Sequence, residues 1–136
     1  MRSGPELFES LDFVYVPSRD VAEEAAYLTG VLGGELVFAI EAMGTRVAMV
    51  RLAAGGGPDV LLAGHLEGER PVLVYRVADL EAATAHLRAR GWEPAPRFGI
   101  PHGPCCAFTA PGGHRFAIYE LTRPEVGEHF AGRRDF

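Results

Sequence analysis

A carboxylate and two guanidinium groups fall within strand-like segments of this sequence, where their side chains could face a binding cavity. Glu120 alternates with Phe116 and Ile118, so the two-residue period of a strand predicts that all three share one face. A carboxylate enclosed in a cavity could anchor a cation, or act as a general base with a raised pKa. Arg51 and Arg76 are in phase with apolar residues of two other segments, and a guanidinium there could hold a ligand anion or pair with Glu120. The structural alternatives are a hydrogen-bonded carboxylate for Glu120 and exposed strand ends for the two arginines.

Aromatic and apolar side chains could form the walls of the same cavity. Phe13 and Tyr15 alternate in phase on the first strand-like segment, and Met49 and Phe98 are further candidates. Such walls suit flat, conjugated ligands, which stack on aromatic rings. His102 lies in a loop rich in Pro and Gly that could act as a lip of the cavity. The alternative for most of these residues is an ordinary hydrophobic core.

The remaining reactive residue types do not form a recognisable site. The five histidines are scattered without the close spacing of a zinc site, and no phosphate-binding or nucleophile-elbow motif is present. The two cysteines, Cys105 and Cys106, are adjacent and are expected to be small buried strand residues. The sequence therefore predicts neither a metal site nor a disulfide.

Composition limits the class of protein. The chain has 136 residues, 48% of them hydrophobic, and a formal net charge of −5. It is long enough to bury a core, and its acidic balance argues against a nucleic-acid partner. No apolar run approaches the roughly 18 residues of a membrane span, and residues 1–9 do not resemble a secretory signal. We therefore expect a cytoplasmic protein with no membrane partner.

The elements that would position these residues recur twice along the chain. Each half is expected to contain a strand, a helix ended by glycine, and three further strands. In the first half the strands are residues 11–16, 35–41, 46–53 and 59–63, around a helix at 21–32. In the second half they are residues 71–77, 92–96, 105–109 and 114–121, around a helix at 80–90, with 97–104 as a loop.

The two halves form an internal repeat. Asp20 matches Asp79 before each helix, Phe13 matches Val72 in each first strand, and the Gly-rich turn before each last strand matches as well. Neither half can bury its sheet face alone. The sequence thus predicts one α+β domain, residues 1–136, in which two βαβββ modules (8–66 and 71–121) form a curved eight-stranded mixed sheet around a cleft, with the helices on its outer face. The tail, residues 122–136, either packs on the body or forms a partly ordered terminus.

The segments VADLEAATAHLRARG and FTAPGGHRFAIYEL, together with LDFVYVPSRD in the first half, resemble the vicinal oxygen chelate superfamily. This superfamily includes glyoxalases, bleomycin-resistance proteins and extradiol dioxygenases. Its enzymes hold a divalent metal through one residue of the first strand and one of the last strand of each half. The resemblance places these positions at Phe13, Gly64 (or His65 after a slip of one residue), Val72 and Glu120.

Three of these four positions carry no side-chain donor, so the resemblance favours the metal-free, bleomycin-resistance type, without a cofactor. The leading hypothesis is therefore the binding and sequestration of a small aromatic or cationic natural product by a homodimer. Its predicted ligand-binding residues are Phe13, Tyr15, Met49, Arg51, Arg76, Phe98, His102 and Glu120. The alternatives are a metal-dependent lyase, isomerase or dioxygenase of the superfamily, with Glu120 as a possible base, and a non-catalytic regulatory module.

Overall fold

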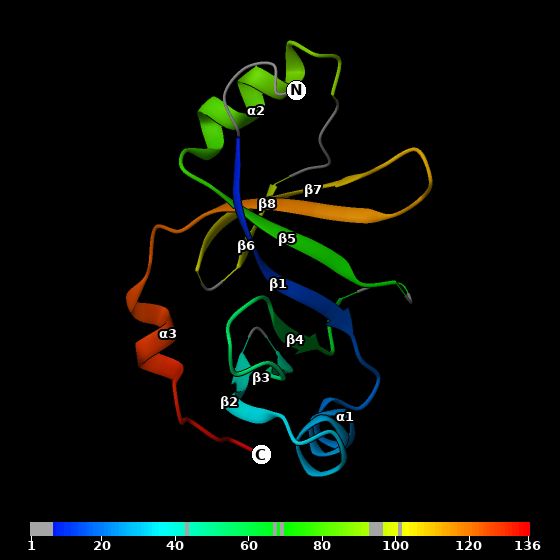
Figure 1. Ribbon diagram of the computed structural model, residues 1–136, viewed down its shortest axis with the longest axis vertical. Helices are drawn as coiled ribbons and strands as arrows, with labels where there is room; N and C mark the ends of the chain where they lie inside the picture. Colours follow the sequence, from blue (N-terminus) through cyan, green and yellow to red (C-terminus); the bar gives the residue numbers. More distant parts are fainter. Residues whose placement is uncertain (1–6, 43, 67, 69, 93–96, 101) are drawn as a thin grey trace.

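The architecture is one eight-stranded mixed sheet with helices packed against it (Figure 1). The computed structural model describes residues 7–42, 44–66, 68, 70–92, 97–100 and 102–136. The first half holds β1 (Phe8–Pro17), α1 (Val21–Ala26), the π-helical turn η1 (Tyr27–Val31), β2 (Glu35–Ala42), β3 (Thr45–Arg51) and β4 (Asp59–Ala63). The second half holds β5 (Val72–Val77), α2 (Leu80–Arg88), β6 (Arg97–Ile100), β7 (Gly103–Thr109), β8 (Arg115–Glu120) and α3 (Glu125–Phe130).

The strand order shows the internal repeat directly. It runs β2-β3-β4-β1-β5-β8-β7-β6, so each half contributes four adjacent strands in the same relative order. Within each half the first and last strands pair in parallel, β1 with β4 and β5 with β8. The halves join through the antiparallel pair β1 and β5, where Phe13 lies opposite Val74 and Tyr15 opposite Val72. The predicted α+β fold with two βαβββ modules is confirmed.

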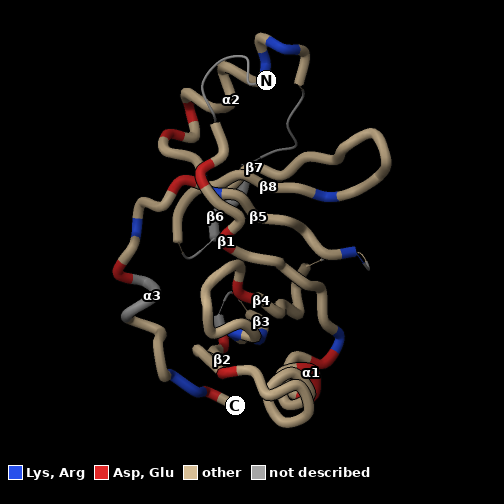
Figure 2. The backbone as a smooth tube through the Cα atoms, viewed as in Figure 1, with Lys and Arg blue, Asp and Glu red and all other residues tan. Residues whose placement is uncertain are grey.

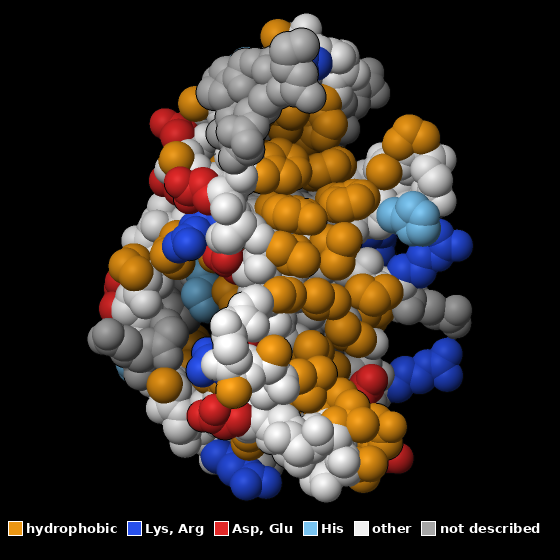
Figure 3. Space-filling model, in the orientation of Figure 1, with side chains coloured by type: hydrophobic (Ala, Val, Ile, Leu, Met, Phe, Trp, Pro, Cys, Tyr) orange, Lys and Arg blue, Asp and Glu red, His pale blue; other side chains and the backbone are white. Residues whose placement is uncertain are grey.

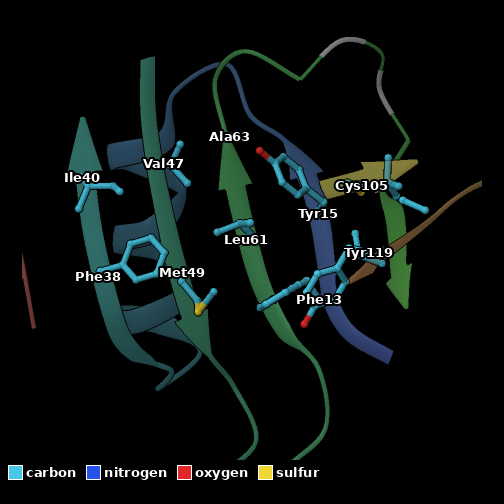
Figure 4. Packing of buried hydrophobic residues seen from close by; sticks show 13 residues of the cluster. Phe13, Tyr15, Phe38, Ile40, Val47, Met49, Leu61, Ala63, Cys105 and Tyr119 are labelled. Atoms are coloured by element: carbon cyan, nitrogen blue, oxygen red, sulfur yellow. The ribbon is translucent and has the colours of Figure 1, made fainter. Parts of the chain in front are cut away.

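One face of the sheet, which we call the inner face, carries the largest hydrophobic cluster (Figure 4). Its side chains come from alternate positions of seven strands, as the period of a strand requires. Phe38, Met49 and Leu61 lie in the first half, and Ala117 and Tyr119 of β8 lie in the second. The inner face is therefore a packed apolar floor along these seven strands.

The opposite face is covered at its two ends by α1 and α2, one helix for each half. Val21 and Ala25 of α1 pack on Leu62 of β4, and Leu80 of α2 packs on Ile118 of β8. Both helices begin at a capping aspartate of the repeat: Asp20 accepts from the Glu23 N–H and Asp79 from the Ala82 N–H, each at 3.0 Å. The helices thus lie on the outer face, as predicted.

Two local predictions need correction, and a third falls largely outside the described residues. The helix expected over 21–32 changes to a π-helical turn at Tyr27, where Thr29 bonds back to the Ala25 carbonyl and the Leu32 N–H reaches the Tyr27 carbonyl. The expected loop at 97–104 contains β6 and the start of β7, whereas the strand expected at 92–96 falls largely outside the described residues.

The tail packs on the body rather than forming a loose terminus. Phe130 of α3 lies 5.7 Å from the ring of Phe38, on the inner face. Backbone bonds from Gly132 to Val37 and between Ala39 and Arg133 then run along β2. The tail therefore covers the outer edge of the sheet, where unpaired strand groups would otherwise be exposed. Among the described residues, no helix is long and apolar enough to cross a membrane.

Candidate functional site

A cleft of about 490 Å³ lies between the inner face of the first half and the tail. Its floor consists of Phe13, Phe38 and Met49, and Pro124, Ala131 and Gly132 of the tail form the opposite wall. The full lining is Phe13, Glu35, Leu36, Val37, Phe38, Met49, Arg51, Asp59, His102, Pro124, Ala131 and Gly132. A space of this size, with an apolar floor and a few polar groups, suits a small-molecule ligand.

The polar groups at one end of the cleft are Arg51, Asp59 and Glu35. Arg51 donates to both carboxylate oxygens of Asp59, through Nε and Nη2 at 3.2 Å each. Glu35 lies opposite Arg51 in the β2–β3 pair. Two carboxylates and one guanidinium thus give this end of the cleft an excess of negative charge.

His102 forms part of the cleft wall and is only 7% exposed. Its ring packs against Phe13, with 4.8 Å between the ring centroids, and its buried Nδ1 has no hydrogen-bond partner. Burial lowers the pKa of His102 below its usual value; Asp12 opposes this shift, and the positive charge of Arg123 adds to it. The imidazole is therefore neutral at pH 7 and able to accept a proton.

A second polar cluster lies on the inner face near His102, at the point where β1 passes β5 and β8. Asp12 accepts hydrogen bonds from Ser10 at 2.5 Å and from the Tyr119 hydroxyl, and its carboxylate lies 3.4 Å from Arg76 Nε. Burial, and then the bond to Asp12, raise the pKa of Tyr119. Asp12 thus holds Tyr119 and Arg76 in place.

Tyr15 shares the inner face with Phe13 but does not line the cleft. Its hydroxyl lies 3.3 Å from Nε2 of His65. Burial, followed by the charge of Cys105, raises the pKa of Tyr15 to about 12, so the phenol stays protonated at neutral pH. The structure therefore separates this Tyr–His pair from the cleft that His102 lines.

The expectation that Glu120 faces the cleft is wrong. In β8, Ala117 and Tyr119 belong to the inner-face cluster, whereas Ile118 packs with α2 on the outer face. Glu120 follows the phase of Ile118, and its Oε1 accepts the Leu80 N–H at 2.8 Å. Glu120 is thus a helix cap rather than a cavity base.

Replacing Glu120 by alanine is expected to lower the free energy of unfolding by about 1 kcal/mol, since the Leu80 amide at the start of α2 loses its acceptor. Urea denaturation measures this loss. Glu120→Gln, which keeps an amide oxygen, should stay close to wild type, and Asp79→Ala at the same helix end should match Glu120→Ala. Unchanged stability together with lost ligand binding would instead place Glu120 in the cleft.

The predicted ligand-binding residues fall into four groups. Phe13, Met49, Arg51 and His102 line the cleft together; Tyr15 and Arg76 lie on the inner face outside it; Glu120 lies on the other face. Phe98 belongs to β6, but its side chain is outside the described residues. Sequence reasoning missed Asp59 of the cleft, and it missed the Asp12–Tyr119 pair. The one available signal was that Tyr119 alternates with Ala117 on the same strand.

The inner face does not offer the donors that a divalent metal needs. The family positions that the resemblance placed at Gly64 and Glu120 are wrong, because Gly64 follows the end of β4 and Glu120 faces outward. The inward residues of those two strands are Leu61, Ala63, Ala117 and Tyr119, which join Phe13 and Val72 in the hydrophobic cluster. Of these only Tyr119 carries a side-chain oxygen, and its hydroxyl donates to Asp12. Throughout the part of the chain that the structure describes, no three His, Cys, Asp or Glu residues come together to hold a metal ion. The residues present therefore do not fit a metal centre.

Comparison with solved structures identifies the fold. Methylmalonyl-CoA epimerase from Mycobacterium tuberculosis superimposes with a TM-score of 0.74 and 21% identity, over 93% of this chain and 97% of the other. A hypothetical protein from Bacillus halodurans gives 0.71 and 12% identity, over 84% and 95% of the two chains. A variant of Streptomyces coelicolor methylmalonyl-CoA epimerase in complex with 2-nitronate-propionyl-CoA gives 0.66 and 18%, over 85% and 99%.

This chain has the vicinal oxygen chelate fold. No family model and no curated protein sequence matches it. The prediction of metal-free antibiotic sequestration is wrong, because solved structures similar to this chain, such as those from Mycobacterium tuberculosis and Streptomyces coelicolor, are epimerases rather than antibiotic-binding proteins. The findings support the alternative, a metal-dependent lyase, isomerase or dioxygenase of the superfamily, better than they support sequestration.

Proposed function

We propose that this chain is an isomerase that moves a proton at the carbon beside the carbonyl group of a small acyl thioester. The observation that carries the proposal is the cleft, which combines an apolar floor, a neutral buried imidazole and a guanidinium in its lining. The epimerases of the same fold support an acyl-CoA substrate. An open cleft of about 490 Å³ also speaks against a regulatory module that has lost its pocket.

The charges of the cleft support a neutral acyl group rather than a second carboxylate. Asp59 already neutralises Arg51, and Glu35 adds a further negative charge to the lining. A dicarboxylic acyl group would face like charges in a partly enclosed space, which costs binding energy. The floor of Phe13, Phe38 and Met49 instead suits a branched aliphatic chain.

In this proposal the apolar floor and Arg51 have separate roles. The apolar floor binds the acyl chain and excludes water from the reacting carbon. Arg51, held by Asp59 at two of its N–H groups, keeps further donors for the carbonyl oxygen, where negative charge develops as the proton leaves. No step runs through a metal, since no three His, Cys, Asp or Glu side chains come together among the described residues.

The test is hydrogen exchange at the carbon beside the carbonyl. The protein is incubated in D₂O with 2-methylbutanoyl-CoA, and with methylmalonyl-CoA as its dicarboxylic counterpart, and deuterium uptake is followed by mass spectrometry. The proposal expects catalysed uptake that is faster for 2-methylbutanoyl-CoA. Glu35→Gln should reduce the difference in the rate of deuterium uptake between the two substrates, because it removes one negative charge that repels the second carboxylate. Binding of both thioesters without catalysed uptake would contradict the isomerase.

The homodimer remains a prediction, and one observation on the outer face supports it. Val60, Val14, Leu73, Phe116 and Phe108 lie side by side across five strands, and all five are partly exposed between the two helices. Figure 3 shows hydrophobic side chains gathered in a band over β8, β5 and β1, and charged residues concentrate on the helices, turns and strand ends (Figure 2). Sedimentation of the wild-type protein and of Leu73→Glu tests this, with dimer and monomer as the expected states.

A further inference from the structure

We infer that His102 is the residue that accepts the proton from the substrate in the cleft, an inference that rests on the proposed isomerase. Its first support is position. The ring forms part of the cleft wall, against Phe13 of the floor, and it is held there by backbone bonds from Thr122 and Arg123 to its own carbonyl oxygen. The histidine thus faces the bound acyl group from a fixed backbone.

The second support is the unsatisfied nitrogen. Buried side-chain polar atoms almost always have a hydrogen-bond partner, so one that lacks a partner calls for an explanation. His102 is more than nine-tenths buried, and its Nδ1 has none. Arg76 Nε and Trp92 Nε1 share this status among the described residues, but neither residue lines the cleft. Nδ1 has almost no exposed surface in this structure, so a ligand in the cleft becomes the partner of this nitrogen when the His102 ring turns towards it.

The third support is the set of charges that faces the ring. Burial keeps the imidazole neutral and ready to accept a proton, while the Asp12 carboxylate stabilises the imidazolium that then forms. Arg123 opposes that charge, and Tyr119, with 6.4 Å between the ring centroids, is uncharged at neutral pH. The environment thus favours the neutral imidazole, while Asp12 lowers the cost of forming the imidazolium that later returns its proton.

The chemical step balances without a further reactant. The C–H bond beside the carbonyl breaks, its electron pair moves to form an enolate, and the proton goes to the imidazole of His102. The oxygen of the enolate lies within reach of the donors of the cleft, among which Arg51 is the cation. Return of the proton, or of a deuteron exchanged from D₂O, restores the acyl thioester in either configuration.

The test compares His102→Gln with wild type in the deuterium assay with 2-methylbutanoyl-CoA. Glutamine keeps a polar side chain of similar length but cannot take up the proton, so the exchange rate is expected to fall about 100-fold or more. The wild-type rate should also fall as the pH drops through the pKa of His102, below about 6.5, and the variant should lose this pH dependence. His65→Gln is the matched control, because His65 bonds Tyr15 outside the cleft, and it should keep the wild-type rate.

The possible outcomes distinguish failure of the proposed role of His102 from failure of the proposed isomerase. Wild-type exchange that persists at full rate in His102→Gln, with the same pH profile, would overturn the role of His102 and leave the isomerase standing. If the wild-type protein shows no exchange, the isomerase fails and the proton transfer to His102 fails with it. NMR titration of the His102 ring protons with 2-methylbutanoyl-CoA then tests the remaining claim, contact of the ligand with the ring: signals that shift support that contact, and signals that do not move contradict it.

Discussion

Replacing Ala117 by glutamate is expected to lower the free energy of unfolding by about 3–5 kcal/mol at pH 7, because it places an unpaired carboxylate in the core. Ala117 has no exposed surface, and it lies beside Val74 of β5 and Ala107 of β7. It occupies the inner face of β8, where the enzymes of this superfamily would place a metal ligand. Chemical denaturation measures the loss.

Ala117→Leu is the matched control, because leucine has nearly the volume of glutamate but no charge. It should cost about 1–3 kcal/mol from overpacking alone. The difference in the free energy of unfolding between Ala117→Glu and Ala117→Leu should depend on pH. Burial raises the pKa of the new carboxyl above the value of about 4.3 in the unfolded chain, so the folded state holds a proton that the unfolded state releases. Stability of the glutamate variant therefore falls as the pH rises above about 4.3, while the leucine variant shows no such added slope.

Adding Zn²⁺ or Co²⁺ to Ala117→Glu should not restore its stability. Phe13, Leu61 and Val72 share the inner-face cluster with Ala117 and have no lone pair to offer, and a divalent ion needs about three or more protein donors. A rise of several degrees in the melting temperature with stoichiometric metal would show that other residues complete a metal centre. It would contradict the donor set described above.

The repeat explains why the fold could be predicted from the sequence. The matched pairs Asp20 and Asp79, and Phe13 and Val72, mark equivalent places in two halves that are each too small to bury a sheet face. In the structure both aspartates cap their helices, and the first strands of the two halves pair with each other. Helix caps and repeat spacing can be identified along the sequence itself, so predictions based on them need no knowledge of tertiary contacts.

The face of Glu120 could not be predicted in the same way. Alternation identifies a buried face only where the other face is polar. In β8, Phe116 and Ile118 are apolar on the outer side, and Ala117 and Tyr119 are apolar on the inner side, because both faces of the strand are covered. The predicted two-residue alternation of β8 was correct, but the sequence of the strand does not indicate which of its two apolar sets of side chains faces the cleft.

The cleft was predicted in part, for a related reason. Phe13, Met49 and Arg51 are in phase on their strands, so their common face followed from the pattern once the strands were placed. Asp12 and Tyr119 are 107 residues apart, and they meet only because β1 and β8 flank β5. A contact of that range depends on strand order and register, which a single strand does not encode.

Replacing Gly103 by alanine is expected to lower the free energy of unfolding by about 3 kcal/mol, since a Cβ has no room at the start of β7. An added Cβ would overlap the carbonyl oxygen of Glu120 and would lie 3.0 Å from Oγ1 of Thr122. The φ of Gly103 is +156°, which L side chains rarely adopt, so the backbone adds to the cost. Because the closest atom belongs to the backbone of β8, it cannot move aside as a flexible side chain would.

Gly30→Ala is the matched control, because a Cβ at that position meets no atom within 4 Å. It should keep or slightly raise the stability, by up to about 1 kcal/mol, through the lower backbone freedom of the unfolded chain. The effect of Gly103→Ala should extend to function, since the residue follows His102 directly and fixes where its ring meets Phe13. We therefore expect slower deuterium exchange at temperatures where Gly103→Ala is still fully folded. If that variant matched Gly30→Ala in both stability and exchange, the close approach of β7 to β8 would be disproved, and with it the placement of His102 in the cleft wall.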